Sequence, residues 1–507
     1  THHIPQCRRT SFAHYNGAMS DIITNPLHQK LLLAAAATGM LFDGLDSSIV
    51  NIVLPQMSES FGIDAGTVSW VVITYLLMMA GLILVFGKIA ERGLLRKIFL
   101  GGLLIFTLGS AACGLSPNFG FLLASRILQG IGAAMIAATA PLLCVTYLPK
   151  NMLGMSLGTM AMTVSIGAVA GPAIGGLITH YLTWHWIFLI NIPIGLLLLP
   201  FGLRAIPKDG PWIKQPFDFT GAALLFGAIV FEVYALERIP HLGIANQQML
   251  ICMILGLVCA IAFLARELHC TTPLINVRIF SAWKFTAVFL AFFIISIVYM
   301  GIFYLLPFYL QAGMQLDPAV SGLYLLISPA ITAIIGIPLG KWSDRIGRRP
   351  FAIVACLILI AISSIYLVII PEMGRILLIA GLILMGLFWG FAGGPVASRV
   401  VDYAPSGEEG TASSLMIAAM YLGCVIGIAL YATTFTIATA EDGIIAFSEL
   451  DMDTLMNGFH FSMMIGLVLS VAAFVLSIIV RERKNGSEAI SQICPENAPL
   501  DAPQSPR

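Results

Sequence analysis

Charged residues are scarce in this sequence. Asp, Glu, Lys and Arg make up only 10% of its 507 residues, whereas 58% are hydrophobic. A soluble globular protein carries about 25% charged residues, so most of this surface is not built for water and faces lipid instead. The formal net charge is zero. The lack of a basic surplus excludes the broad positive field that attracts nucleic acid.

The features of several enzyme classes are absent as well. The nine cysteines form no Cys-x-x-Cys pair and have no histidine at metal-binding spacing, so we infer neither a disulfide framework nor a metal site. The segment Gly154–Gly158 fits the hydrolase pattern Gly-x-Ser-x-Gly, but that pattern needs a preceding strand, and here it opens an apolar helix. Gly81–Lys88 resembles a phosphate-binding loop with the wrong spacing. We therefore expect no enzyme and no cofactor, with an ion or solute gradient as the energy source.

We expect no cleavable signal peptide, because the first apolar run begins near Leu31 and is too long for an h-region. The segment Thr1–Ala18 is polar and irregular, and Met19 opens a more usual sequence. Two origins stay open for residues 1–18: a flexible tail, or the product of an over-extended reading frame.

Long apolar runs fill most of the chain. A membrane-spanning helix needs about 20 apolar residues. One run, Asn151–Leu203, is long enough for two spans that turn near Thr183–Trp184, so fourteen spans are predicted. Because the runs are apolar on all sides and rich in glycine, they indicate a helix bundle and not a barrel. Two of the other predicted spans, Leu31–Pro55 and Phe219–Leu236, carry acids. The rest lie in the uncharged stretches Ala65–Gly87, Ile98–Ser125, Ile127–Pro149, Ile239–Ala265, Phe285–Leu316, Pro318–Gly340, Pro350–Pro371, Ile376–Ser398, Gly410–Ala440 and Thr454–Val480.

The distribution of basic residues predicts the orientation. If both termini are cytoplasmic, 23 of the 26 Lys and Arg residues fall on the cytoplasmic side, and only Arg238 and Arg375 fall outside. The positive-inside rule therefore favours an even number of spans with both termini inside. We expect a multi-pass protein of the cytoplasmic (inner) membrane.

A distant internal repeat divides the chain. Gly87-Lys-Ile-Ala-Glu-Arg92 returns 253 residues later as Gly340-Lys-Trp-Ser-Asp-Arg345. Parallel repeats of six helices are the arrangement found in major facilitator transporters, whose binding site lies between the halves. The predicted regions are a cytoplasmic tail (1–30), a six-helix bundle (31–205), a linker with two inserted helices (206–283), a second six-helix bundle (284–480) and a C-terminal tail (481–507).

Two aspartates lie inside the first predicted span. Asp43 and Asp46 are one turn apart on one helix face. A carboxylate there costs about 2.5–3.5 kcal/mol on insertion scales, so it should face a cavity or a partner. Burial also favours the neutral form, and a carboxyl group that exchanges a proton is what proton coupling needs. The alternative is a structural polar patch near the helix end.

Arg126 is the one Lys or Arg that falls within the predicted spans. A buried guanidinium needs an anionic partner, and the two aspartates of the first span are the candidates. Movement of Arg126 towards Asp46 would favour proton release. A static buried ion pair is the alternative.

Small residues recur every four positions in the fifth predicted span. This spacing lets helix backbones approach closely, and the proline adds a bend. The later half contains only Gly423-x-x-x-Gly427. The residues of the first-half motif are Gly167, Gly171, Pro172, Gly175 and Gly176.

Other polar and aromatic residues could face a central cavity. Glu232 is a third acid within the spans, in an inserted helix, where it is either neutral, near the membrane edge or paired. Aromatic rings attract apolar or cationic ligands, although each ring could equally serve ordinary packing. The candidates for substrate contact are Gln129, Asn51, Tyr304, Trp389 and Tyr421.

These motifs resemble those of the fourteen-helix drug:proton antiporter branch of the major facilitator superfamily. Leu45–Pro55 resembles the first-helix motif, whose aspartate, here Asp46, is implicated in coupling. Arg126–Ala134 resembles the fourth-helix motif with its proton-linked arginine. Gly167–Gly176 resembles the motif that separates exporters from symporters, and Trp184–Gly195 resembles the signature of the fourteen-helix branch. The resemblance extends over about Leu31–Val480.

The family's cytoplasmic gating motif is complete only in the later half. In the first half Gly87 and Arg92 match, but Glu91 replaces the aspartate, and Leu94 and Leu95 replace the usual Gly and Arg. The predicted later-half spans also lack the acid that some relatives use, which argues against polyvalent cationic substrates. The matching residues of the later half are Gly340, Asp344, Arg345, Gly347, Arg348 and Arg349.

The resemblance implies a monomeric, proton-driven antiporter that exports a small organic compound by alternating access. Three alternatives stay open: an exporter of one metabolite or siderophore, a solute:proton symporter of the same fold, and a membrane enzyme or sensor. The last would require a polar catalytic cluster or a soluble domain, and the chain has neither pattern.

Overall fold

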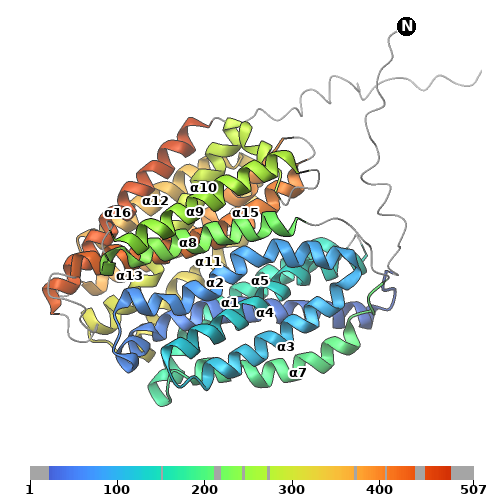
Figure 1. The fold of residues 1–507 in the computed structure, drawn as a ribbon, viewed down its shortest axis with the longest axis horizontal. Coiled ribbons are helices and arrows are strands. Elements are labelled where there is room, and N and C mark those ends of the chain that lie inside the picture. The colour runs from blue at the N-terminus through green and yellow to red at the C-terminus, as the bar shows by residue number, and fades with distance from the viewer. Residues whose placement is uncertain are drawn as a thin grey trace, which may run out of the picture.

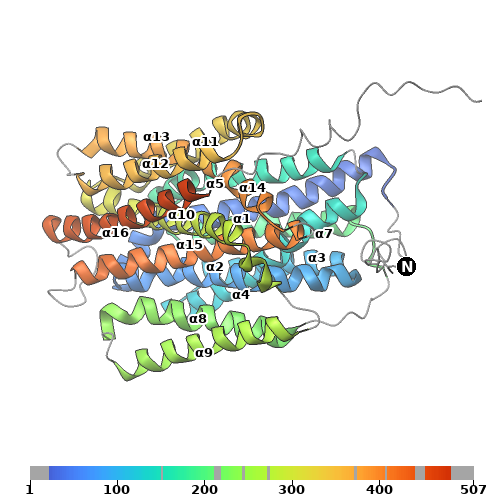
Figure 2. The same cartoon turned by 90° about the horizontal axis from the view of Figure 1, so that it is seen from above.

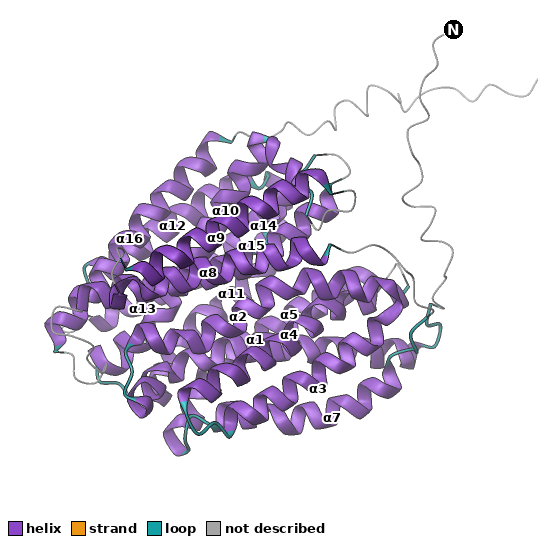
Figure 3. Ribbon diagram, viewed as in Figure 1, coloured by secondary structure: helices purple, strands orange, loops and turns teal. Residues whose placement is uncertain are grey.

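The computed structural model describes residues 22–149, 152–210, 218–242, 246–270, 275–369, 374–405, 408–439 and 451–480. In this part of the chain, fourteen helices are long and apolar enough to cross a membrane. Helices and their connections make up the described residues, and no strand occurs among them (Figure 3). The predicted all-α membrane fold with fourteen spans is confirmed. The segment Thr1–Ala18 and the tail 481–507 lie outside the described residues.

The N-terminal half contains six spans. The turn predicted near Thr183–Trp184 lies between α5 and α6, and α6 and α7 together form the sixth span. The elements are α1 (Pro26–Phe61), α2 (Ala65–Ile89), the π-helical turn η2 (Ala90–Leu94), α3 (Leu95–Gly114), α4 (Phe119–Tyr147), α5 (Leu153–Tyr181), α6 (Trp186–Leu189) and α7 (Asn191–Ala205).

Two helices separate this half from the second group of six spans. These inserted helices are α8 (Phe219–Leu242) and α9 (Gln247–His269). The later elements are η4 (Val277–Ser281), α10 (Trp283–Phe308), η5 (Tyr309–Gly313), α11 (Pro318–Ile346), α12 (Arg349–Leu367), α13 (Gly374–Ala392), α14 (Pro395–Asp402), α15 (Glu409–Thr439) and α16 (Met452–Ile479).

The prediction that Arg126 lies inside a span is confirmed, although the uncharged stretches on either side of it do not match the helix ends. The chain turns earlier, between Gly114 and Phe119, and Arg126 lies inside α4. The side chain of Asn118 begins α4 by accepting a hydrogen bond from the backbone N–H of Phe121 at 2.9 Å. A capping residue satisfies the free N–H groups at a helix start. A charge with a buried partner, in contrast, does not end a helix.

The turn of the inserted pair lies later than predicted. We predicted a span over Phe219–Leu236, which is confirmed, and a second apolar stretch from Ile239. The structure continues α8 to Leu242 and begins α9 after Asn246, whose side chain caps the helix by accepting from the N–H of Gln248 at 2.9 Å. Caps therefore locate both helix starts better than charges do.

The two halves lie side by side as separate helix groups (Figure 1). In the first half α1 packs on α5, and α4 packs on α2 and α3. In the second half α10 packs on α15 and α16, and α11 packs on α13. Across the boundary α5 meets α11, and α2 meets α15. The boundary therefore has two seams, one formed by α5 and α11 and one by α2 and α15.

The inserted helices form a hairpin that covers one of these seams. Helix α8 packs on α9 and contacts both α2 and α15. The hydroxyl of Thr433 on α15 donates to the carbonyl oxygen of Leu236 on α8 at 2.9 Å. On the other side, Phe226 of α8 sits against Gly81 of α2, where an added Cβ would lie 2.4 Å from its ring. Figure 2 shows the hairpin on the opposite side of the molecule from α5 and α11.

The two ends of the bundle differ in packing. We call the end at which α1 begins and α16 ends the terminal face, and the opposite end the distal face. Near the distal face, an added Cβ at Gly322 of α11 would lie 2.2 Å from the carbonyl oxygen of Pro172 of α5. Near the terminal face, an added Cβ at Gly87, Gly158 or Gly340 would meet no atom within 4 Å. The halves are therefore in close backbone contact near the distal face, whereas these three glycines near the terminal face contact no neighbouring atom.

Candidate functional site

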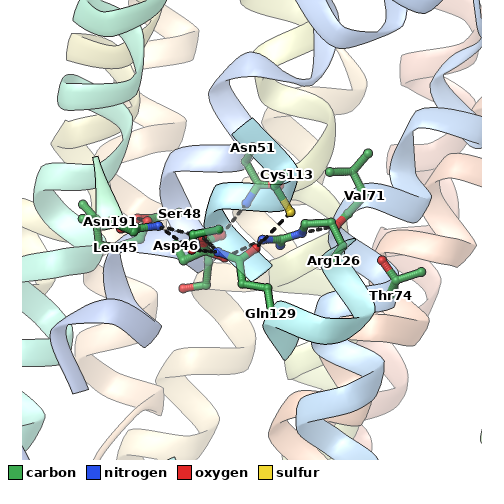
Figure 4. Close-up of polar contacts among 12 residues, drawn as sticks. Leu45, Asp46, Ser48, Asn51, Val71, Thr74, Cys113, Arg126, Gln129 and Asn191 are labelled. Atoms are coloured by element: carbon green, nitrogen blue, oxygen red, sulfur yellow. Dashed lines mark hydrogen bonds and ion pairs between the residues drawn. The ribbon is translucent and has the colours of Figure 1, made fainter. Parts of the chain in front are cut away.

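The centre of the N-terminal half contains a fully buried ion pair. The Oδ2 atom of Asp46 on α1 lies 2.6 Å from Nη1 of Arg126 on α4, and both side chains are 0% exposed (Figure 4). In so dry a setting each charge depends on the other, because an isolated buried ion loses most of its hydration energy. Of the two first-helix candidates, the structure thus pairs Arg126 with Asp46.

Gln129 connects the two members of this pair. Its Nε2 atom donates to Oδ1 of Asp46 at 2.8 Å, and its Oε1 atom accepts from Nη1 of Arg126 at 2.6 Å. The Nε2 atom also donates to the hydroxyl of Ser110 at 2.8 Å. We predicted Gln129 as a substrate-cavity residue. In this structure it is fully buried inside the first half and belongs to the ion-pair network.

Arg126 is held from several directions. Its Nε atom donates to the carbonyl oxygen of Val71 on α2 at 2.8 Å. Its Cζ atom lies 4.3 Å from the ring centroid of Tyr75 and 5.6 Å from that of Phe188, so both rings offer cation–π contact. Its Nη2 atom has no hydrogen-bond partner among the described residues. The arginine therefore retains donor capacity that the present arrangement does not use.

Glycines bring these helices close enough for the network to form. An added Cβ at Gly109 of α3 would lie 2.7 Å from the backbone nitrogen of Gln129. An added Cβ at Gly130 of α4 would lie 2.8 Å from the carbonyl oxygen of Tyr75. A larger residue at either position would push α4 away from α3 or α2.

Three members of the network were not predicted as site residues from the sequence. Ser110 accepts the hydrogen bond of Gln129, and the thiol of Cys113 lies 3.6 Å from Oε1 of Gln129. Asn191, inside the Trp184–Gly195 motif, extends its Nδ2 atom to Oδ1 of Asp46 at 3.5 Å. Serine, cysteine and asparagine at these positions look like ordinary helix residues. Only the fold, which places them beside Asp46 and Gln129, shows that they belong to the network.

The predicted glycine motif of α5 forms backbone contacts with two helices. An added Cβ would lie 2.6 Å from the Leu45 nitrogen at Gly167 and 1.9 Å from the Ser48 hydroxyl at Gly171. At Gly175 it would lie 2.6 Å from the Ile52 side chain. These three glycines face α1. Gly176 faces α11 instead, with an added Cβ 2.4 Å from the carbonyl oxygen of Pro318.

The gating segments turn through glycines in the left-handed region. Gly93 has a φ of 94° and Gly347 has a φ of 100°. In the repeat, Gly347 corresponds to Leu94, so the left-handed glycine is one residue earlier in the first half. The turn is thus preserved although the motif glycine is replaced, because Gly93 can adopt this conformation without a Cβ clash.

The arginines of the later gating motif bind within their own half. Arg348 forms an ion pair with Asp402 at the end of α14 and donates to the carbonyl oxygen of Ser398 at 3.2 Å. Arg349 donates to the carbonyl oxygen of Ile478 on α16 at 2.9 Å. Arg92 is buried, whereas Arg345 is exposed. The side chains of Glu91 and Asp344 lie outside the described residues.

The remaining cavity candidates occupy different environments. Tyr421 of α15 donates its hydroxyl to Oδ2 of Asp43 on α1 at 2.9 Å, which joins the two halves. Tyr304 is fully buried and donates to the carbonyl oxygen of Ala65 near the distal face. Trp389 stacks on Tyr299 with ring centroids 4.7 Å apart. Asn51 is buried, and its Nδ2 atom donates to the carbonyl oxygen of Ser47 at 3.0 Å.

Glu232 does not join these residues. It lies exposed on α8, where its carboxylate packs beside α9: an added Cβ at Gly256 would lie 2.6 Å from Oε1. No cluster of three or more His, Cys, Asp or Glu side chains suited to a metal ion occurs in the part of the chain that the structure describes.

Comparison with known proteins identifies the family. The Major Facilitator Superfamily model matches residues 36–428. The chain belongs to the major facilitator superfamily. It is therefore a membrane transporter, in agreement with the motif resemblance and the two-bundle fold.

Its relatives include transporters of different substrates. The riboflavin transporter RibZ of Clostridioides difficile is 28% identical over 80% of this chain and 88% of its own length. The multidrug resistance protein B homolog of Mycobacterium tuberculosis is 28% identical over 79% of this chain and 75% of its own. The multidrug efflux pump LfrA of Mycolicibacterium smegmatis is 26% identical over 81% and 82% of the two chains.

Solved structures share the fold at low identity. A bacterial homolog of the human lysosomal transporter Spinster aligns with a TM-score of 0.63 and 13% identity, covering 91% of this chain and all of that one. The POT family transporter PepTSo aligns with a TM-score of 0.64 and 14% identity, covering 90% of this chain and 97% of that one. At such identity the likeness concerns the fold alone.

Proposed function

We propose that this protein is a proton-coupled antiporter that exports small organic compounds across the cell membrane, with both termini in the cytoplasm. The observation that carries the proposal is the fully buried pair of Asp46 and Arg126. A carboxylate this deep can bind a proton in exchange for its arginine partner, because protonation removes the charge that the pair neutralises. The multidrug resistance relatives support drug export as the direction and cargo.

The network of Asp46 suggests how a proton could be passed on. When Asp46 binds a proton, its attraction to Arg126 falls, and Gln129 still offers Oε1 to the guanidinium. The free Nη2 atom of Arg126 and the ring of Tyr75 provide the arginine with further contacts. The proton then leaves when Arg126 again approaches the carboxylate. This exchange needs no cofactor and draws its energy from the proton gradient.

Alternating access would open the distal face and close the terminal face. The tight contact of α5 with α11 at Gly176 and Gly322 would have to separate in the outward-open state. The open surroundings of Gly87, Gly158 and Gly340 near the terminal face support our proposal that the present conformation receives cytoplasmic substrate. One copy of the chain contains both halves of this device, so we propose a monomer in the lipid bilayer.

Everted membrane vesicles test the proposal. An imposed proton gradient should collapse faster when a transported compound is added to vesicles that contain the protein. Asp46→Asn should abolish this response, and Glu232→Gln, which changes an acid outside the network, should preserve it. If a panel of drugs and metabolites never alters the gradient, and Asp46→Asn changes nothing, proton-coupled antiport is wrong.

A second candidate is transport of a single metabolite. The similarity to the riboflavin transporter RibZ favours it to the same degree as the multidrug relatives favour broad export. A substrate panel distinguishes the two. Broad export predicts that cells lacking the gene become sensitive to several unrelated drugs, and single-metabolite transport predicts no such change but altered flux of one compound.

A further inference from the structure

A pocket opens at the distal face within the N-terminal half. It has a volume of about 490 Å³ and lies where the end of α1, the turn between α3 and α4 and the turn between α5 and α6 meet. Phe61, Trp184 and His185 form its aromatic wall. The proposed proton exchange uses Asn191 of the Trp184–Gly195 motif and leaves the rings of Trp184 and His185 without a role.

The aromatic wall is fixed by its own contacts. The rings of Trp184 and His185 are stacked, with centroids 3.7 Å apart and planes 18° apart. The Phe61 ring centroid lies 5.5 Å from that of Trp184, and Nε1 of Trp184 donates to the Ser60 hydroxyl at 3.1 Å. A wall that is already ordered loses little side-chain entropy when a ligand binds.

The polar atoms of the pocket offer lone pairs. The Ser116 hydroxyl donates its hydrogen to the carbonyl oxygen of Cys113 at 2.8 Å. The Thr179 hydroxyl donates to the carbonyl oxygen of Gly175, also at 2.8 Å. The Oε1 atom of Gln56 is buried and has no hydrogen-bond partner in the described structure. A ligand that supplies hydrogen-bond donors would satisfy these acceptors.

The pocket is electrically neutral. No Asp, Glu, Lys or Arg is among the described residues that line it. Burial lowers the pKa of His185, and a hydrogen bond with the backbone of Ser116 offsets only part of this effect, so the ring is neutral at pH 7. A phosphate or carboxylate would find no cation here, and an ammonium group would find no anion. The lining therefore favours an uncharged ligand that is rich in donors.

The surroundings place the pocket at the edge of the bilayer. Tyr181 and Trp186, on either side of the turn that lines the pocket, are 76% and 48% exposed. Exposed tyrosine and tryptophan rings gather at the level of the lipid head groups. Leu177, one turn before Tyr181 on α5, is 51% exposed and continues this surface into the membrane. A ligand can thus arrive from water or as the head group of a lipid.

We propose that this distal pocket binds a neutral sugar ring. Its hydroxyl groups donate to Gln56, Ser116 and Thr179, and its C–H face packs on the aromatic wall. A pyranose ring fits because it is uncharged, carries several donors and has one flat, less polar face. A free saccharide and the head group of a glycolipid share this chemistry. The site goes beyond proton exchange, and only its assignment to the outer side rests on the proposed function.

Ligand binding to the purified full-length protein in phospholipid nanodiscs tests the site. Saturation-transfer NMR compares methyl β-glucoside with methyl β-glucuronide, which has a carboxylate in place of the CH₂OH group. The glucoside should bind at least about tenfold more tightly, because the pocket has no cation for the carboxylate. Native mass spectrometry is the second arm, in which monoglucosyl diacylglycerol should be retained in preference to phosphatidylglycerol if the sugar is a head group. Glycolipid retention without glucoside binding identifies a lipid ligand, and glucoside binding shows that a free saccharide suffices.

Variants separate binding from folding. Gln56→Leu removes the unpaired acceptor and should weaken sugar binding about twofold to tenfold, the effect of one hydrogen bond. Because Oε1 of Gln56 has no partner, this variant should keep or raise the melting temperature of the protein. Gln247→Leu, at an exposed position at the start of α9, is the matched control and should bind like wild type. Thr183→Arg, at an exposed position in the lining, adds a cation and should shift the preference towards the glucuronide.

Three results would overturn the proposal. The first is wild-type protein that binds neither the glucoside nor the glycolipid. The second is equal binding of glucoside and glucuronide. The third is a Gln56→Leu variant that binds sugar as well as Gln247→Leu does. The assays contain no proton gradient, so such a failure leaves proton-coupled antiport standing, and loss of proton exchange with intact sugar binding would refute antiport alone.

Discussion

The carboxylate of Asp46 and the guanidinium of Arg126 lie 2.6 Å apart, fully buried between α1 and α4. Residues 80 positions apart in the chain are thereby joined inside one half of the transporter. Each charge is tolerated in the dry interior because the other is present. The pair therefore governs stability as well as the proposed proton exchange, and the two roles can be measured separately.

Removing one member of this pair should destabilise the protein more than removing both. Arg126→Gln leaves Asp46 buried without its cation, a change that costs about 3–5 kcal/mol in comparable pairs. The double variant Asp46→Asn with Arg126→Gln should recover part of that loss, because no charge is left unpaired. Thermal unfolding of the purified variants in one detergent measures this. If the double variant loses the sum of the two single effects, the charges are not coupled as described.

Gly171 should resist even the smallest side chain. An added Cβ would lie 1.9 Å from the Ser48 hydroxyl and 2.9 Å from the Ile49 nitrogen, so Gly171→Ala must push α5 away from α1. We expect a loss of about 1–3 kcal/mol, the usual effect of overpacking. The matched control is Gly158→Ala in the same helix, where an added Cβ meets no atom within 4 Å. Equal melting temperatures for the two variants would contradict the close approach.

The distal link between α5 and α11 should depend on pH. The Nδ1 atom of His180 lies 2.8 Å from Oδ2 of Asp317, and Oδ1 of Asp317 accepts from the N–H of Ala319 at 2.8 Å. The backbone N–H of Ala319, and then His180, lower the pKa of the Asp317 carboxyl group. A lowered pKa in the folded state means that the carboxylate stabilises the protein above its unfolded-state pKa of about 4 and loses this effect as the pH falls further.

The Asp317→Ala variant tests this dependence. It should melt at a lower temperature than wild type at pH 7, and the difference should shrink as the pH falls below about 4. Asp317→Asn keeps a capping side chain for α11 and loses the charge, so it separates the cap from the ion pair. A difference that stays constant from pH 7 to pH 3 would rule out the carboxylate as its source.

Phe226 and Gly81 should behave as a complementary pair that seats the inserted hairpin. Gly81→Ala places a Cβ 2.4 Å from the Phe226 ring and should loosen the contact of α8 with α2. Adding Phe226→Ala should restore part of the lost stability, because it removes the atoms that clash. Thermal unfolding of the two single variants and the double variant gives the coupling. Strictly additive effects would show that the ring and the glycine do not pack together.

Much of the fold follows from the sequence because its cause is local. Twenty apolar residues must form a helix in lipid, so the spans could be counted before any contact was known. The partner of Arg126 was narrowed to two aspartates for a similar reason, since a buried cation needs an anion. The choice between Asp43 and Asp46 was not local. It depends on how α4 is placed beside α1, and the close approach of α4 to α3 and α2 at Gly109 and Gly130 is part of that placement.

The errors have physical causes too. The uncharged stretches did not locate the helix ends, because α4 contains Arg126 and begins at the cap of Asn118. Gln129 was predicted as a substrate-cavity residue, and in this structure its amide hydrogen-bonds to both members of the ion pair. The bond between Asp43 and Tyr421 joins residues 378 positions apart, so no periodicity or spacing in the sequence could have indicated it.

The inserted hairpin makes the two lipid-facing flanks of the transporter different. Helices α8 and α9 lie over the seam of α2 and α15, whereas in the described structure no such pair covers the seam of α5 and α11. The side of α5 that meets α11 near the distal face continues towards the terminal face as Met155, Met162 and Ile166, which are 56%, 60% and 50% exposed. Acyl chains can therefore reach the boundary between the halves on the flank of α5 and α11. On the flank of α2 and α15 the hairpin separates this boundary from the lipid.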